Sequence, residues 1–129
     1  MSDSFKSFDT LNVSVKTLSS IDLISETSYD KWTDLTICDG AVCKRIKTPS
    51  DYHGFLIKFE TGAKTLRHKN FNEYEILDVR VGRIKNLVTN ETYVEGDVIT
   101  FDKGEEHELY CQEEAYIYCV MSKNKRDLG

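Results

Sequence analysis

The sequence predicts an all-β protein, and two patterns in the chain support that prediction. In the second half, turn residues recur about every eight to twelve residues, which is the strand spacing of a β-sandwich or β-barrel. Between the turns, apolar residues stand at every second position, as do Phe55, Ile57 and Phe59. No stretch keeps a helical period for long, so a helical fold is not expected.

Length and composition predict one domain over residues 1–129. The chain is 40% hydrophobic and 30% charged, which argues against disorder. Its net charge is -5, so no overall positive field would attract a nucleic acid polymer. No apolar run reaches the roughly 20 residues of a membrane helix, and the first 15 residues have no apolar signal-peptide core. We therefore expect a cytoplasmic protein without a membrane partner.

The first 50 residues contain three segments with a readable pattern. Residues 11–18 predict a strand, because apolar side chains alternate there. Residues 19–29 fit either a short strand or one helical turn. Residues 31–48 predict a β-hairpin whose turn lies at Asp39–Gly40. The alternating apolar residues of the first segment are Leu11, Val13 and Val15.

The second half predicts a series of strands. One strand covers residues 53–62, and a short strand at residues 65–70 follows it. Further strands follow from residue 75 to residue 123. The turn signals that separate them are Gly82, Asn90, Gly96, Gly104 and Glu113–Glu114.

The four cysteines have no CxxC spacing, which argues against a zinc ribbon or a thioredoxin-like motif. Cys111 and Cys119 stand among apolar and aromatic residues and are expected to be small buried side chains. Cys38 and Cys43 flank the predicted hairpin turn, which would bring them close together. A structural disulfide between them would be unexpected in the cytosol.

Three side chains of the second half, His68, Glu75 and His107, form a candidate metal site, with Asn70 beside them. His68 and Asn70 stand two residues apart and so share one face of a strand. Glu75 lies on the next predicted strand, and His107 follows a glycine-marked turn. Two histidines and one carboxylate suit a divalent transition metal with open coordination positions. The alternatives are an exposed His68, a surface Glu75 with Glu73 equally suited by chemistry, and a His107 in a charged turn.

The same residues resemble the two motifs of the cupin family in order and spacing. The first motif is matched by Gly62, His68, Asn70, Glu75 and Gly82, with Asn70 where the family has a second histidine. The second is matched by Gly96, Asp102, Gly104, His107 and Cys111, with Asp102 and Cys111 where the family has proline and asparagine. The match covers residues 52–121.

The resemblance implies an RmlC-like jelly-roll barrel, or double-stranded β-helix, with a ligand cavity inside. It implies a metal site at His68, Glu75 and His107, with Asn70 at the fourth position, for Fe, Mn, Ni, Cu or Zn; the degenerate site could equally be empty. His53 is a further nitrogen that could complete the set. The resemblance also implies a homodimer formed through the N-terminal strands of residues 1–50.

Aromatic and basic side chains suggest a ligand other than a metal. Tyrosines offer flat apolar walls with a hydroxyl tip, which suit a sugar or a base, and an arginine suits an anionic group. The candidate ligand-binding residues are Tyr74, Tyr93, Tyr110, Tyr118 and Arg80.

Three functions remain open at this point. The first is a metal-dependent enzyme of the dioxygenase, isomerase or lyase type, acting on a small polar metabolite. The second is a metal-free cupin that senses or sequesters a sugar- or nucleotide-like ligand. The third is a metal-free sugar-nucleotide epimerase, which needs a histidine base with a positioned acid.

Overall fold

The computed structural model describes residues 14–49 and 51–128, and these residues form two β-sheets. The prediction of an all-β fold is confirmed. The larger sheet has the strand order β2-β3-β4-β10-β6-β7, and β8 also pairs with β6. Its strands are β2 (Thr33–Asp34), β3 (Cys38–Ile46), β4 (Tyr52–Thr65), β6 (Tyr74–Asn86), β7 (Glu91–Val94), β8 (Val98–Phe101) and β10 (Leu109–Ser122).

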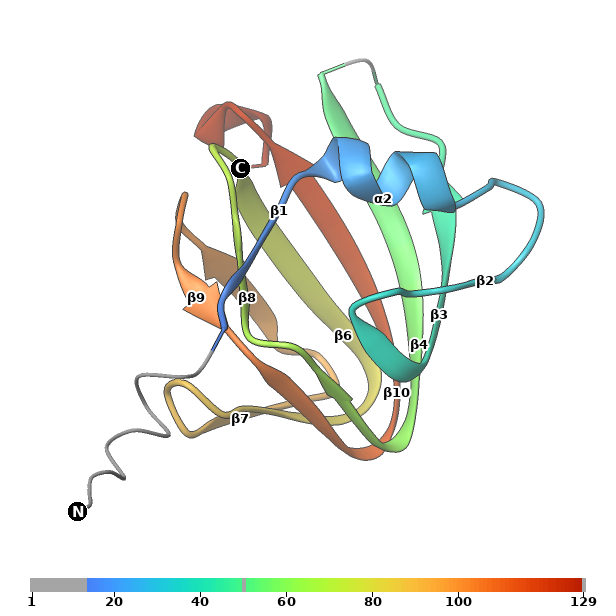
Figure 1. Cartoon of the computed structure of the whole chain (residues 1–129), viewed down its shortest axis with the longest axis vertical. Coiled ribbons are helices and arrows are strands. Elements are labelled where there is room, and N and C mark those ends of the chain that lie inside the picture. Colours follow the sequence, from blue (N-terminus) through green and yellow to red (C-terminus); the bar gives the residue numbers. More distant parts are fainter. Residues whose placement is uncertain (1–13, 50, 129) are drawn as a thin grey trace.

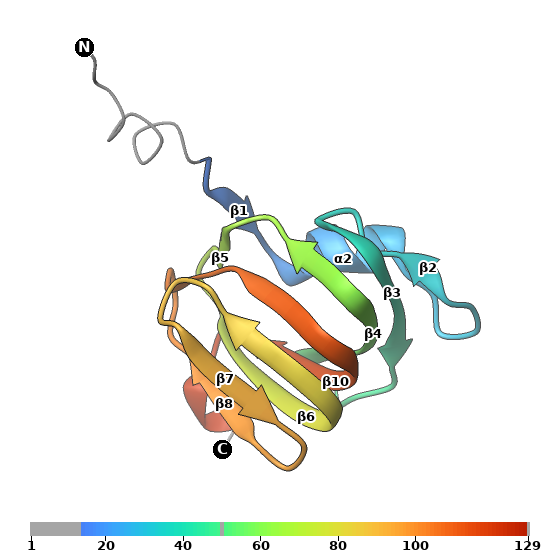
Figure 2. The same ribbon diagram turned by 90° about the horizontal axis from the view of Figure 1, so that it is seen from below.

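The smaller sheet has three short strands in the order β1-β5-β9. They are β1 (Lys16–Leu18), β5 (His68–Asn70) and β9 (Glu106–His107). β1 runs parallel to β5, and β9 runs antiparallel to it. In Figure 1, β1 and β9 lie on one side of the molecule, and β3 and β4 lie on the other. Figure 2 shows the same curled arrangement from below.

The core lies inside this double-sheet barrel, because the long strands alternate in burial. In β10, Ile117, Cys119 and Met121 are buried, whereas Tyr118 and Val120 between them are partly exposed. Burial of one face of each strand is the pattern that the alternation of apolar residues predicts. The inward residues of β4, β6 and β10 therefore line the interior of the barrel, where a site can form.

One α-helix, α2 (Ser20–Glu26), follows β1, and a 3-10 helix, η1 (Lys125–Asp127), lies near the C-terminus. Of the two open readings for residues 19–29, the helix is the one observed. A capping box favours the helix over the strand, because the Asp22 carboxylate accepts a hydrogen bond from the Ser19 backbone N–H at 2.9 Å. Leu23 is buried, whereas Ile21 is 68% exposed. Within the described residues, no helix has both the length and the apolar character of a membrane span.

The predicted hairpin turn at Asp39–Gly40 is wrong. The chain turns at Thr36 and Ile37 instead, and β3 already includes Asp39 and Gly40. Gly40 has a φ of +86° at a shift in the β3–β4 register, so the Asp-Gly pair forms a bulge within a strand. Cys38 and Cys43 consequently lie on one strand and are free thiols, as are Cys111 and Cys119. The expected burial of Cys111 and Cys119 is confirmed.

The predicted strand breaks at Gly82 and Glu113–Glu114 are also wrong, and both have one cause. β6 and β10 continue through these positions, with a shift in their register at the same level. Gly82 has a φ of +94°, and a Cβ there would overlap the backbone of Glu114 and Ala115. The glycine therefore marks a close approach of two strands. The turns at Asn90, Gly96 and Gly104 are observed where the sequence predicts them.

The strand predicted over residues 11–18 lies only partly within the described residues. Leu11 and Val13 lie outside the described residues, and the observed strand β1 begins at Lys16, after Val15. β1 pairs with β5, and β3 pairs with β4. The first 50 residues thus contribute strands to both sheets of the barrel. Their role in a homodimer stays a prediction.

Candidate functional site

Strand register brings the two motif histidines together. His68 of β5 pairs directly with His107 of β9 in the antiparallel ladder. Their ring centroids lie 4.1 Å apart, with an angle of 70° between the ring planes. His68 is 5% exposed and His107 is 1% exposed, whereas Lys69 is partly exposed. Both histidines therefore point into the barrel, and the surface alternatives for them are excluded.

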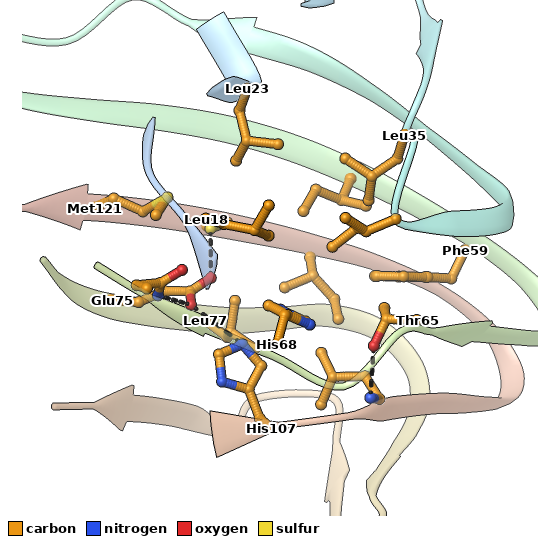
Figure 3. Close-up of a pocket in the computed structure, with 16 residues that line it drawn as sticks. Leu18, Leu23, Leu35, Phe59, Thr65, His68, Glu75, Leu77, His107 and Met121 are labelled. Carbon is orange, nitrogen blue, oxygen red and sulfur yellow. Dashed lines mark hydrogen bonds and ion pairs between the residues drawn. The ribbon is translucent and has the colours of Figure 1, made fainter. Parts of the chain in front are cut away.

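Glu75 lies beside this pair and accepts two short hydrogen bonds. The Asn70 amide donates to Glu75 Oε1 at 2.6 Å, and the Cys119 thiol donates to Oε2 at 2.8 Å. His107 Nε2 is 3.4 Å from Oε1, and Figure 3 shows Glu75, His68 and His107 side by side. Glu75 is 7% exposed, because its position in β6 belongs to the inward face. We call His68, Asn70, Glu75, His107 and Cys119 the inner cluster.

Burial keeps both imidazoles neutral at pH 7. Removal from water lowers the pKa of His107 to about 4, a change that the nearby Glu105 carbonyl only partly opposes. The pKa of His68 is also lowered, first by burial and then by His107. His68 Nδ1 lies 2.7 Å from the Leu66 carbonyl oxygen. A carbonyl can only accept, so Nδ1 carries the proton and Nε2 keeps a lone pair for a ligand.

His107 has unsatisfied polar capacity inside the barrel. Its Nδ1 has no hydrogen-bond partner among the described residues, although the Glu105 carbonyl lies near enough to affect its pKa. Its Nε2 makes only the 3.4 Å contact with Glu75. The ring stacks on Phe101 at a centroid distance of 4.1 Å, which fixes its plane. Buried polar groups normally have a partner, so this ring has hydrogen-bonding capacity that a water, an ion or a ligand atom would satisfy.

The donor set fits a divalent transition metal by its chemistry, although it is not arranged around one. Neutral imidazoles, each with one ring nitrogen able to bind a metal, and a carboxylate are suitable ligands. Within the described residues, no group of three or more His, Cys, Asp or Glu side chains is already arranged to hold a metal ion. Glu75 accepts hydrogen bonds from Asn70 and Cys119 instead. Metal binding would require Glu75 to exchange at least one of these hydrogen bonds for the metal.

The cavity at the inner cluster is small and mostly apolar. Its volume is about 40 Å³, enough for a few water-sized molecules. Leu18 of β1, Leu23 of α2, and Leu35 line it opposite the polar side chains, as Figure 3 shows. These leucines fill space that a larger ligand would need. The inner cluster can therefore hold a metal or a small group, and a sugar-sized molecule needs additional room.

The predicted tyrosine and arginine side chains are not part of this cavity lining. Tyr74, Tyr110 and Tyr118 are partly exposed on the outward-facing positions of β6 and β10. Arg80 is exposed and lies 5.0 Å from the centre of the Tyr118 ring. Tyr93 is buried in β7, and its hydroxyl accepts a hydrogen bond from Asn86. A ligand-binding role for these residues stays a prediction, and it would apply outside the inner cavity.

Two features of the site were not expected from the sequence. The sequence predicts Cys119 only as a small buried residue, whereas its thiol donates a hydrogen bond to Glu75. The alternation in β10 places Cys119 inward, but it does not indicate that Glu75 is its partner. Glu73 is buried too, but its carboxylate accepts hydrogen bonds from the Ser20 backbone and hydroxyl and so holds α2. His53 lies two strands from Glu75, with Met121 of β10 between them, and is not beside His68.

Comparison with known proteins supports the fold. No family model and no curated protein matches the sequence. The structure is similar to KdgF from Halomonas sp., with a TM-score of 0.65 and 18% identity over 77% of this chain and 91% of that one. It is also similar to an RmlC-like cupin from Shewanella frigidimarina, with a TM-score of 0.63 and 16% identity over 77% of this chain and 88% of that one. A third similar structure is an acetylacetone dioxygenase from Acinetobacter johnsonii, with a TM-score of 0.62 and 10% identity over 70% of this chain and 67% of that one.

Proposed function

We propose, from the cupin fold of this chain, that the protein binds a divalent transition metal through His68, Glu75 and His107 and a small molecule beside it. One observation carries the proposal: two buried neutral imidazoles and a carboxylate converge, and Nδ1 of His107 lacks a hydrogen-bond partner within the described residues. A metal bound there would supply Lewis-acid polarisation of a ligand oxygen. Asn70 would orient Glu75 through its amide, and Phe101 would fix the ring of His107.

The similar structures are compatible with this proposal without specifying a reaction. They include a dioxygenase, a predicted oxalate decarboxylase and a sugar phosphate isomerase. Active sites with different chemistry occur on one fold, so the reaction depends on the groups around the site. The apolar leucines over the inner cluster favour chemistry in a site from which bulk water is excluded.

The metal content of purified protein tests this proposal, because the chain has three histidines and only two belong to the site. The untagged wild type and His53→Ala, the matched control, should contain near-stoichiometric metal after loading with iron, manganese, nickel or zinc. His68→Ala and His107→Ala should contain little. Metal that is absent from every sample, or lost equally in His53→Ala, would contradict the site.

A second candidate is a metal-free ligand-binding cupin. The observation that favours it is the pair of short hydrogen bonds that already occupy both oxygens of Glu75. It predicts that small sugars raise the melting temperature in the presence of a chelator and that added metal does not. A sugar-nucleotide epimerase is less favoured, because a cavity of about 40 Å³ at His107 is too small for a nucleotide.

A further inference from the structure

A second and larger cavity lies next to the inner cluster and has the size of a ligand site. Its volume is about 380 Å³, within the range of roughly 300–1,000 Å³ that is typical of small-molecule pockets. It lies between the start of α2, the loop that joins β5 to β6, the start of β4 and the end of β10. We call it the outer cavity.

Apolar and polar side chains share the lining of the outer cavity. Ile21 and Phe71 line it although they are 68% and 67% exposed, so an apolar surface is available to a ligand. His53, Asn72 and Asn124 supply polar groups that donate and accept hydrogen bonds. An aromatic surface beside such groups suits a ligand with one apolar face and several hydroxyls.

The charges around the outer cavity distinguish between ligand classes. Lys123 is a cation, but Asp51 and Glu73 also line the cavity, and Glu73 is a buried carboxylate. A phosphate group would meet these two carboxylates, and like charges in a partly desolvated site repel each other. An uncharged polyol meets no such repulsion, and its hydroxyls can donate to carboxylates and accept from amides.

We propose that the outer cavity binds an uncharged hydroxylated small molecule of the monosaccharide class. The sugar ring packs on Phe71, and its hydroxyls bond His53 and the amides of Asn72 and Asn124. The tyrosines singled out in the sequence are not needed for this recognition. The cavity would supply the room that the inner cluster lacks.

Met121 separates the outer cavity from the inner cluster. It lines both cavities, and it pairs with His53 on one side and with Glu75 on the other. The three side chains thus form one cross-strand row on the inward face. Methionine is unbranched and adaptable, so it can move aside. If the proposed metal function holds, a sugar bound outside would reach the inner cluster past Met121.

Titration with unphosphorylated sugars, followed by ¹H–¹⁵N NMR, tests the outer cavity independently of any metal. The probes are D-glucose, D-galactose, D-mannose and D-xylose, with D-glucose 6-phosphate for comparison, added to chelator-treated protein. At least one neutral sugar should shift the amide signals of Phe71, Asn72 and Asn124. That neutral sugar should bind at least tenfold more tightly than D-glucose 6-phosphate does. Phe71→Ala and His53→Ala should each weaken that binding at least fivefold.

Two controls separate this proposal from the metal proposal. Val98→Ala removes a comparably exposed apolar side chain elsewhere and should bind the sugar as the wild type does. His107→Ala should lose metal yet keep sugar binding in the outer cavity. No shift with any neutral sugar, tighter binding of the phosphate, or unchanged affinity in Phe71→Ala would overturn the proposal, whatever the metal content is.

Discussion

At the scale of single residues, His107 combines burial, stacking and an unmet hydrogen bond. The ring is 1% exposed and lies against Phe101. Its neutral form is favoured because burial penalises the charged form. A neutral imidazole is the form that binds transition metals, so burial keeps His107 in the protonation state that the proposed metal site needs. Two predictions belong to this scale.

The first concerns stability in acid. The pKa of His107 is about 4 in the folded protein, against the ordinary histidine value of 6.5, so the unfolded chain takes up the proton first. Its contribution is complete above pH 6.5 and falls as the pH drops toward 4, by on the order of 3 kcal/mol. Urea unfolding of chelator-treated protein should show a steeper decline over this range in the wild type than in His107→Gln. Equal slopes would contradict the buried neutral state.

The second concerns Asn70, the departure from the cupin motif. Asn70→His adds an imidazole next to Glu75, and it should tighten zinc binding by roughly tenfold or more, measured by competition with a chelating dye. Asn70→Ala, which removes the amide without adding a ligand, is the control and should not bind zinc more tightly. Weaker binding in Asn70→His than in the wild type would show that the position does not face the metal.

At the scale of elements, the β6–β10 pair depends on a glycine, and α2 depends on a carboxylate. Gly82 allows β6 to pass the bulged part of β10. Glu73 accepts hydrogen bonds of 2.7 Å and 2.6 Å from the Ser20 backbone and hydroxyl, which fixes the start of α2 against the loop before β6. Gly82 thus helps to position β6, the strand that carries Glu75. Glu73 positions α2, the helix whose Leu23 lines the cavity beside Glu75.

Gly82→Ala should destabilise the fold more than a left-handed backbone alone explains. Gly62 has a similar φ of +91°, but nothing lies within 4 Å of the Cβ it would gain. Gly62→Ala should therefore cost about 1–2 kcal/mol. Gly82→Ala adds overlap with backbone atoms and should cost at least about 3 kcal/mol. Equal changes in the free energy of unfolding for the two variants would rule out the close approach.

Glu73→Ala should release α2 from the barrel. The loss of two hydrogen bonds to a buried carboxylate should cost about 2–4 kcal/mol and speed amide hydrogen exchange in residues 20–26. Asp22→Ala removes the exposed cap of the same helix and should cost about 0.5–2 kcal/mol. If exchange in α2 is as slow in Glu73→Ala as in the wild type, the carboxylate does not hold the helix.

At the scale of the whole molecule, the resemblance to the two cupin motifs predicts the barrel and the meeting of His68, Glu75 and His107. Alternation in the second half was enough for the fold class, because each strand buries one face. Other features depend on contacts between distant segments. The Cys119–Glu75 hydrogen bond spans 44 residues, and the Gly82 approach depends on the β10 register. The sequence predicts turns at Gly40 and Gly82, although both lie in strands, because a glycine in a bulge and one in a turn look alike in sequence.

The central claim is that His68 and His107 bind a metal together. It is tested most directly by adding zinc to metal-free protein and recording long-range ¹H–¹⁵N spectra of the histidine rings. The Nε2 signals of His68 and His107 should shift together and saturate at one equivalent, while the His53 ring stays unchanged. A shift of His53 alone, or no shift of either buried ring with excess zinc, would contradict the claim.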